Sequence, residues 1–388
     1  MLMSKYKIMI MTASVGCGHD QVAGIIEKQL LDKHENIEIK IIDFIDIFPP
    51  AMGQFIKSAY LKMIDKAPNW YNLLYKFTAK SNQKNKVSSI FTYKYKKKIS
   101  ALIKVFNPHM ILFTNPFPLI LVSQLKRKNK INTYTASIIT DYTAHSVWLD
   151  PTIDSYFVGS DILKKEMMDR GINALKIHVT GIPVDRKFNM PVNREEKMAE
   201  LGLDVNLPTV LVMGGGLGLG SIEEILETTD KIDRPLQLIV VAGKNESLKY
   251  ELENRIYNQK HNVKVFGFCS NIHELMECSH LLISKAGGLT MAEAAIKKLP
   301  ILVFDPIPGQ EVKNAQYFSY MGAAIYLKDL EEIRNAIDEL LYRKPEKRLG
   351  MVGCCSMVCK PRAAEDVSDF ILEKINNMVH GGILRDGP

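Results

Sequence analysis

The stretch of sequence that decides the fold is Leu281-Leu282-Ile283-Ser284-Lys285-Ala286-Gly287-Gly288-Leu289-Thr290-Met291-Ala292-Glu293-Ala294-Ala295. A short apolar run ends at Ser284, a loop of small residues follows, and we expect a helix from about Thr290. Strand, glycine turn and helix start are the opening of a doubly wound α/β unit. The unpaired N–H groups and the dipole of such a helix start form a site for a phosphate or diphosphate.

Two interpretations of the same stretch remain open. Glu293, one turn into the helix, could accept hydrogen bonds from a sugar hydroxyl beyond the phosphate, as in a sugar-nucleotide site. Alternatively, Thr290-x-x-Glu293 is a capping box that only closes the helix start, and Gly287-Gly288 is only a tight turn.

The pattern of buried strand, loop and helix recurs along the 388 residues. The expected strands span 6–14, 37–43, 109–114, 133–139, 155–158, 176–180, 208–213, 236–242, 263–266, 281–284 and 300–304. They are nearly continuous apolar runs, which is typical of parallel strands covered on both faces. The sequence therefore predicts an α/β protein with two doubly wound, Rossmann-like domains.

The chain length suits two domains of ordinary size. We expect an N-terminal domain over residues 1–182, a polar linker over 183–206 and a second domain over 207–360. The last segment, 361–388, is expected to form a helix that packs back on the first domain.

Two further loops follow expected strands. Residues 214–220 contain five glycines in seven positions, which lets the backbone curve around an anion or approach a ligand closely. Residues 306–314 form a Pro-Gly turn and the start of a helix that carries Gln310, Glu311 and Asn314. Amide and carboxylate groups suit vicinal hydroxyls, although Glu311 could equally be a favourable charge in a first helical turn.

In the first domain, His19 follows Gly18 in the loop between the first strand and its helix. This edge of a doubly wound sheet holds ligands, so a chemical role for His19 is favoured over a structural one. A second polar loop, 140–148, follows another strand and contains Asp141 and His145, which are candidate acid, base or acceptor-binding groups. The alternative is a network that only ties Asp141 to nearby backbone.

Composition narrows the setting. No apolar run reaches the roughly 18 residues that span a bilayer, and the N-terminus lacks a signal-peptide pattern. The six cysteines include no CxxC pair and no metal-ligand spacing, which favours a reduced, cytosolic compartment.

Positive charge is concentrated in one segment. Residues 51–104 contain twelve lysines but a single acidic residue, whereas the whole chain carries a net charge of +7. The lysines alternate with aromatic and aliphatic side chains, as in segments that lie on an anionic membrane. The residues that we assign to this surface are Trp70, Tyr71, Lys94, Lys96, Lys97 and Lys98. The alternatives are a solvated helix pair that packs on the sheet, or a nucleic-acid surface, which the scarcity of arginine disfavours.

Taken together, these motifs resemble those of the GT-B glycosyltransferases that build glycolipids from UDP-sugars. The chain looks most like the processive diacylglycerol glucosyltransferases of bacteria and the monogalactosyldiacylglycerol synthases. It is similar, more distantly, to the enzyme that adds N-acetylglucosamine to the lipid-linked peptidoglycan precursor. The matching stretches are 14–19, 140–145, 214–218, 285–290 with Glu293, and 308–311 with Asn314.

The resemblance implies that the two domains face each other across a cleft and that the second domain binds the UDP-sugar. The implied donor-binding residues are Gly215, Gly216, Gly267, Phe268, Gly288, Leu289, Thr290, Glu293, Gln310, Glu311 and Asn314. Within this set, the resemblance implies that uracil lies near Gly267 and Phe268, that Glu293 holds the ribose and that the diphosphate lies on the helix start at 288–290. It assigns Gln310, Glu311 and Asn314 to the hexose. On the acceptor side the resemblance implies Gly18 and His145, with His19 as the general base and Asp141 as the second candidate.

The implied reaction is inverting transfer of a hexose, glucose in preference to galactose, from a UDP-sugar to diacylglycerol or a glycosyl-diacylglycerol. The scheme needs no metal and no other cofactor. The implied location is cytoplasmic, peripheral on the inner face of the cell membrane, with an anionic membrane surface but no nucleic acid as partner. The sequence leaves open the number of sugars added and self-association. It also leaves open a polyprenyl-linked acceptor, a sugar-nucleotide epimerase and a non-catalytic UDP-sugar sensor.

Overall fold

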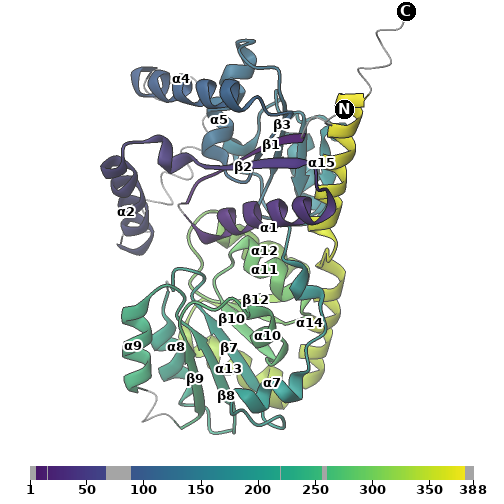
Figure 1. The fold of residues 1–388 in the computed structure, drawn as a ribbon. Coiled ribbons are helices and arrows are strands. Elements are labelled where there is room, and N and C mark those ends of the chain that lie inside the picture. Colours follow the sequence, from purple (N-terminus) through teal and green to yellow (C-terminus); the bar gives the residue numbers. More distant parts are fainter. Residues whose placement is uncertain (1–5, 15, 67–88, 219, 256–259, 381–388) are drawn as a thin grey trace, which may run out of the picture. The chain divides into compact units, whose positions relative to one another are not determined.

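The computed structural model describes residues 6–14, 16–66, 89–218, 220–255 and 260–380 (Figure 1). The chain forms two compact units. Unit 1 comprises Met1–Asp185 and Arg362–Pro388, and unit 2 comprises Arg186–Pro361. The polypeptide therefore leaves unit 1 once and returns to it near its end.

Unit 1 is built around a six-stranded parallel sheet with the order β2-β1-β3-β4-β5-β6. The strands are β1 (Tyr6–Thr12), β2 (Ile37–Asp43), β3 (Met110–Phe113), β4 (Tyr134–Ile138), β5 (Ser155–Val158) and β6 (Ile177–Val179). β1 and β2 pair along their full length, from Tyr6 opposite Ile37 to Thr12 opposite Asp43. Because β1 is covered on both faces, all its residues except Lys7 are buried, which explains its nearly continuous apolar sequence.

Helices cover both faces of this sheet. They are α1 (Cys17–Lys33), η1 (Phe44–Ile47), α2 (Pro50–Lys66), α4 (Ser89–Phe106), α5 (Pro116–Arg127), η2 (Ser146–Trp148), α6 (Asp161–Asp169), η3 (Ala174–Lys176) and α15 (Ala363–His380). Met9 and Met11 share one hydrophobic cluster with residues of α4 and α5, such as Ile99 and Val122. Strand side chains alternate between faces, so Ile8 and Ile10 point to the opposite face, where α1 contacts β1, β2 and α15.

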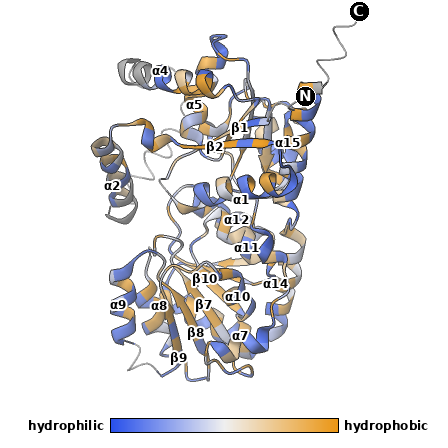
Figure 2. Ribbon diagram, in the orientation of Figure 1, coloured by the Kyte–Doolittle hydropathy of each residue, from blue (hydrophilic) through white to orange (hydrophobic). Residues whose placement is uncertain are grey.

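Unit 2 contains a second six-stranded parallel sheet, with the order β12-β11-β10-β7-β8-β9. Its strands are β7 (Thr209–Met213), β8 (Gln237–Val241), β9 (Asn262–Phe266), β10 (Leu281–Ser284), β11 (Ile301–Val303) and β12 (Ala324–Tyr326). β7, β8 and β10 are buried over their whole lengths, and Figure 2 shows these strands in hydrophobic colours.

The helical elements of unit 2 are η4 (Arg186–Asn189), α7 (Arg194–Glu200), α8 (Ile222–Thr229), α9 (Glu246–Arg255), α10 (Ile272–Glu277), α11 (Gly288–Ile296), α12 (Gln310–Tyr320), α13 (Leu330–Asp338), the π-helix η6 (Glu339–Arg343) and α14 (Pro345–Val358). α8 and α13 contact each other, and their side chains share one hydrophobic cluster with the strands. α11 packs between α12 and α14.

The predicted fold class is confirmed: each unit is a doubly wound parallel sheet. Two details differ from the sequence prediction. β12 was not expected, because a three-residue strand gives almost no periodic signal. Residues 183–206, expected to be a linker, include α7, where Met198 is fully buried and the Lys197 ammonium lies 2.9 Å from the Glu274 carboxylate of α10.

The end of the chain is an integral part of unit 1. α15 buries Val367, Ile371 and Ile375, and the Phe370 ring packs edge-to-face on Phe157 of β5, 5.2 Å between centroids. Unit 1 is therefore complete only when residues 363–380 are in place.

We expect Ile371→Ala to lower the free energy of unfolding of unit 1 by about 2–5 kcal/mol, because it leaves a cavity under a fully buried side chain. Both tryptophans of the chain, Trp70 and Trp148, belong to unit 1, so tryptophan emission in a urea titration reports on this unit. The exposed Glu373→Ala on the same helix is the matched control. Equal urea midpoints for the two variants would contradict the packing of α15.

Candidate active site

In each unit the strand order reverses at one place, and loops leave the sheet there in opposite directions. In unit 1 this switch point lies between β1 and β3, and in unit 2 it lies between β7 and β10. Doubly wound sheets bind ligands outside the carboxyl ends of the strands at such a point. The loops before α1 and α11 are therefore the expected ligand-binding and catalytic regions of the two units.

His19 lies in the first turn of α1, at the switch point of unit 1. Its Nδ1 is 3.0 Å from the Thr140 hydroxyl, which follows β4. Its ring is partly buried, and the centroid lies 6.3 Å from that of the buried Trp148. The start of α1 and the loop 140–148, which are distant in sequence, therefore fix the position of this imidazole.

The charge state of His19 results from opposing effects. Burial lowers the pKa of His19 below the usual 6.5, whereas the Asp141 carboxylate, a backbone hydrogen bond with Thr114 and the Asp20 carboxylate act to raise it. Burial dominates, so the imidazole is neutral at neutral pH. The structure thus brings His19 and Asp141 close enough to interact, with Gly18 beside them in the first turn of α1.

His145 has a structural contact of its own. Its Nδ1 accepts the backbone N–H of Val147 at 3.3 Å, which caps η2, and the residue is buried. The backbone of the preceding residue, Ala144, is held by Glu166 of α6 and by Arg170, which directly follows that helix. The loop that contains Asp141 and His145 is therefore a fixed part of the fold.

The glycine loop of unit 2 lies against the loop that follows β8. Gly218 has φ +60°, and a Cβ there would lie 1.9 Å from the Ala242 carbonyl oxygen. The carbonyl oxygens of Gly215 and Gly216 lie against Gly243 in the same way, and the Lys244 N–H donates to the Gly216 oxygen at 3.1 Å. At least part of the glycine content of this loop is therefore required by contact between two loops.

The start of α11 differs from the expected one. The helix begins at Gly288, with Gly287 as its N-cap, so Thr290 is the third helical residue. The capping-box interpretation of Thr290 and Glu293 is wrong, because that motif needs Thr290 at the N-cap. Gly287 has no side chain that could accept the N–H groups of the first turn, which are those of Gly288, Leu289 and Thr290.

The start of α12 lies beside this helix start. The Glu311 carboxylate accepts the Ile307 N–H at 2.7 Å and lies close to Gly287 and Thr290. Asn314 is fully buried, and its amide donates to the Ala286 carbonyl oxygen at 3.0 Å. Asn314 thus holds the loop before α11, while Gln310 and Glu311, which are partly exposed, begin the helix.

Gly267 and Phe268 follow β9 at the same edge of the sheet. The Phe268 ring is 53% exposed, and the Lys244 ammonium lies 5.3 Å from its centroid. Gly267 lies against the side chains of Lys249 and Glu246 in α9. An exposed aromatic face with a lysine on it suits a planar base.

Sequence reasoning missed a polar group at the switch point of unit 2. The Lys285 side chain crosses Gly220, which has φ +105°, and the Asp305 carboxylate lies beside them and accepts from the Ser221 hydroxyl at 3.3 Å. Each residue directly follows a strand or the glycine loop. A position just after a strand or the glycine loop could have marked each residue as a candidate site residue. That the three residues lie close together depends on the strand order, which the sequence does not give.

The basic surface is also broader than the sequence suggested. Lys97 and Lys98 are exposed on α4, and the pKa of Lys96 is lowered by partial burial and by Lys128 and Arg127 at the end of α5. Trp70 and Tyr71 lie outside the described residues, as does the side chain of Lys94.

None of the helices that the structure describes combines the length and the apolar composition that a bilayer span requires. Within the described ranges, no three His, Cys, Asp or Glu side chains are grouped as metal ligands.

Solved structures share the fold of the whole chain. MurG from Acinetobacter baumannii has a TM-score of 0.64 at 16% identity, covering 95% of this chain and 99% of that one. The complex of Staphylococcus aureus MnaA with UDP has a TM-score of 0.63 at 14% identity, with 97% of each chain covered. Anabaena HepE in complex with UDP-glucose has a TM-score of 0.57 at 11% identity, covering 96% of this chain and 99% of that one. At these identities the likeness shows the GT-B fold.

Sequence comparisons identify the family. Residues 19–184 match the monogalactosyldiacylglycerol (MGDG) synthase model, and residues 209–350 match the glycosyltransferase family 28 C-terminal domain. The processive diacylglycerol beta-glucosyltransferase of Bacillus thuringiensis (strain Al Hakam) is 33% identical over 372 residues, which is 95% of this chain and 94% of that protein. The protein of the same name from Bacillus cereus (strain 03BB102) is 34% identical over 370 residues, 94% and 93% of the two chains. The chain therefore belongs to the family of the processive diacylglycerol beta-glucosyltransferases and is a glycosyltransferase.

Proposed function

We propose that this protein transfers glucose from UDP-glucose to diacylglycerol or a glycosyl-diacylglycerol, with inversion at the anomeric carbon. The observation that carries the proposal is the relationship to diacylglycerol beta-glucosyltransferases along nearly the entire chain. The two switch points support it, because one presents a neutral imidazole and the other a helix start suited to a diphosphate.

His19 is the general base of this reaction. A neutral imidazole can take the proton of the acceptor hydroxyl as that oxygen attacks the anomeric carbon and UDP leaves. The Asp141 carboxylate stabilises the imidazolium that forms, since it acts to raise the pKa of His19. Burial and Asp141 thus have complementary roles: the first keeps the base neutral, and the second lets it accept a proton.

Unit 2 binds the donor. The N–H groups at the start of α11, together with Gly215 and Gly216 of the glycine loop, stabilise the charge that grows on the diphosphate. Glu293 accepts from the ribose hydroxyls, the backbone at Gly267 and the Phe268 ring hold uracil, and Gln310 and Glu311 contact the hexose. Asn314 is buried and positions the loop before α11 through its hydrogen bond to the Ala286 carbonyl oxygen.

The defining experiment incubates the protein with radiolabelled UDP-glucose or UDP-galactose and vesicles that contain diacylglycerol, followed by lipid chromatography. We expect a labelled glycolipid with UDP-glucose. Binding of UDP without lipid labelling would indicate a sensor, and labelling only when a polyprenyl-linked sugar is supplied would indicate the other acceptor class.

The pH dependence of kcat/KM tests the role of His19. The base must be neutral, so activity should be retained down to pH 6.5 and fall below it, as pH drops through the lowered pKa of His19. Asp141→Asn removes a charge that raises this pKa, so the acidic limb should move to still lower pH. His19→Gln should lower turnover roughly 10²–10⁴-fold and abolish the limb. Full turnover in His19→Gln, with UDP binding intact, would make His19 structural.

Glu293→Gln tests donor binding separately. Loss of a charged acceptor for the ribose should raise the KM for UDP-glucose roughly ten- to hundredfold, the usual worth of hydrogen bonds to charged groups. The KM for diacylglycerol should not change. Glu331→Gln, in the first turn of α13, removes the same charge from an exposed position and is the control. Equal KM values for the two variants would remove Glu293 from the donor site.

We further propose that the protein is a cytoplasmic enzyme, peripheral on the inner face of the cell membrane, and that the basic surface of α4 and α5 contacts anionic lipid. Lysines near an anionic surface each contribute about 1 kcal/mol to such contact. The clustering of Lys96, Lys97, Arg127 and Lys128 supports this assignment.

The combined variant Lys96→Gln, Lys97→Gln, Lys128→Gln should bind phosphatidylglycerol vesicles on the order of a hundredfold more weakly at low salt. Sedimentation with the vesicles measures this loss, and raising the salt concentration should reduce the difference. The control replaces Lys231, Lys328 and Lys360 of unit 2 by Gln, which removes the same net charge. If both triple variants bind equally, the basic surface is not the contact.

A further inference from the structure

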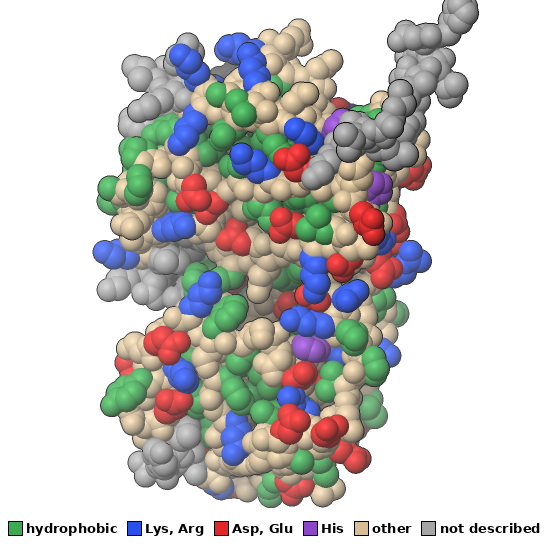
Figure 3. Space-filling model, in the orientation of Figure 1, with side chains coloured by type: hydrophobic (Ala, Val, Ile, Leu, Met, Phe, Trp, Pro, Cys, Tyr) green, Lys and Arg blue, Asp and Glu red, His purple; other side chains and the backbone are tan. Residues whose placement is uncertain are grey.

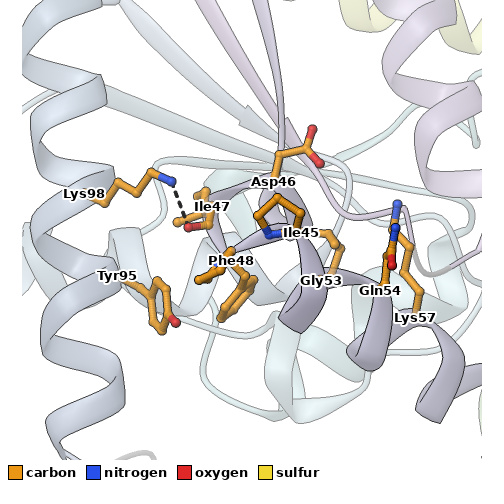
Figure 4. Close-up of a pocket in the computed structure, with 11 residues that line it drawn as sticks. Ile45, Asp46, Ile47, Phe48, Gly53, Gln54, Lys57, Tyr95 and Lys98 are labelled. Atoms are coloured by element: carbon orange, nitrogen blue, oxygen red, sulfur yellow. Dashed lines mark hydrogen bonds between the residues drawn. The ribbon is translucent and has the colours of Figure 1, made fainter.

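A large pocket in unit 1 has no role in the reaction as described so far. It has a volume of about 770 Å³ and lies between η1, α2 and α4. This volume is in the range of sites for small molecules, which occupy roughly 300–1,000 Å³. Figure 4 shows Gln54 and Lys57 of α2 along one side, Tyr95 and Lys98 of α4 along the other, and Phe48 between them.

The lining is divided by chemistry. Its apolar part comes from η1 and the prolines that follow it, and includes Ile45, Ile47 and Phe48. The Phe48 and Tyr95 rings lie 4.4 Å apart between centroids, which makes one wall aromatic. The polar part contains three side chains that donate hydrogen bonds, the Gln54 amide and the ammonium groups of Lys57 and Lys98, and one carboxylate, that of Asp46. Lys98 already donates to the Ile47 carbonyl oxygen at 2.9 Å, which holds it at the rim (Figure 4).

Asp43 joins this pocket to the loop before His19. It ends β2 and accepts the Ile45 N–H at the start of η1, which lines the pocket. The same carboxylate accepts the N–H of Ser14 at 3.1 Å and also the Ser14 hydroxyl, in the loop between β1 and α1. Lys57, a pocket residue, has its ammonium 3.8 Å from Asp43.

Asp20, the neighbour of His19, lies within range of charges from both the pocket and the base. Burial raises the pKa of Asp20, the Asp43 carboxylate also acts to raise it, and the Thr12 hydroxyl, His19 and Lys57 act to lower it. A pocket lysine and the proposed base therefore act on the same carboxyl group. Since these residues belong to one unit, their proximity is a property of that unit alone.

We propose that this pocket binds one acyl chain of the lipid acceptor, with the ester carbonyl at the rim, among the donors Gln54 and Lys57 on one side and Lys98 on the other. The inference rests on the proposed function and names the acceptor's binding site. In a diacylglycerol the reacting hydroxyl is separated from an ester by two carbons. When that hydroxyl is at His19, the ester must therefore be bound close to His19. The apolar chain attached to the ester must then be buried away from water in a site next to the bound ester. Ester carbonyls accept hydrogen bonds, which matches the donors at the rim.

The surface beside the pocket fits a lipid that enters from a bilayer. On α2 the Phe55 side chain is 71% exposed, although it is large and apolar. Figure 3 shows hydrophobic and basic side chains next to each other where α2 lies. Exposed apolar residues with lysines among them are typical of segments at a membrane interface.

The first test narrows the pocket and varies the acyl chain. Gln54→Trp should lower kcat/KM for dioleoylglycerol at least about tenfold, because exclusion of every two methylene groups costs about one factor of ten. Transfer to dihexanoylglycerol in the same detergent micelles should fall only several-fold, because this acceptor loses the Gln54 donor but little apolar contact. The KM for UDP-glucose should change less than about twofold. Ala59→Trp adds the same side chain to an exposed position of α2 that does not line the pocket. An unchanged dependence on chain length in Gln54→Trp would overturn the proposal.

A pair of neighbouring lysines separates ester binding from membrane charge. Lys98 lines the pocket and Lys97 does not, yet both are exposed on α4. We expect Lys98→Gln to raise the KM for dihexanoylglycerol several-fold and Lys97→Gln to leave it unchanged, because this acceptor is offered in neutral micelles. Equal effects would show that Lys98 contributes only surface charge.

Photolabelling of the wild-type protein keeps the proposal testable if a variant does not fold. A diacylglycerol with a diazirine at the end of one acyl chain should, on irradiation, label peptides from η1, α2 and α4, and excess dioleoylglycerol should prevent this. Labelling of the pocket without sugar transfer would refute the proposed function and leave the binding site standing. Sugar transfer with labels only elsewhere would refute the site and leave the function standing.

Discussion

The reversal of strand order beside the first strand of each sheet is the constraint on which the rest of the structure depends. Parallel strands place all their carboxyl ends at one edge, and the reversal separates the two neighbouring loops there. In unit 1 this brings residues after β1, β3 and β4 to one imidazole. In unit 2 it leaves the glycine loop next to the loop that leads from β10 to α11. Neither arrangement depends on a single unusual residue.

The proposed base shows how burial and charge combine in such a place. Desolvation alone would make His19 a poor proton acceptor, and the carboxylates alone would keep it protonated near neutral pH. The observed surroundings contain both, with burial as the larger effect. Asp43 in turn fixes the backbone around this base, since its carboxylate accepts hydrogen bonds both from the loop before α1 and from the start of η1.

Much of the fold could be predicted from the sequence, because buried parallel strands are nearly continuous apolar runs and glycine loops mark their ends. Errors arose where local pattern and tertiary structure disagree. Glycine is a poor helix former, so Gly288 was read as part of a turn, although it is the first residue of α11. The place of Asn314 in the donor site, which the resemblance implies, stays a prediction; its burial and its bond to Ala286 could not be predicted, because they depend on how α12 packs. The proximity of Lys96 to Lys128, and of Lys285 to Asp305, depends on contacts between segments that the sequence does not show to be neighbours.

The return of α15 to unit 1 has a consequence for biosynthesis. Ribosomes release a chain from its amino end, so residues 186–361 emerge and can fold before the helix that completes unit 1 exists. Until then the α1 side of the first sheet lacks the cover that Ile371 and Ile375 provide, and its apolar surface is open to solvent. Unit 1, although its first part is translated first, is thus the second to mature, because it stays incomplete until residues 363–380 have emerged.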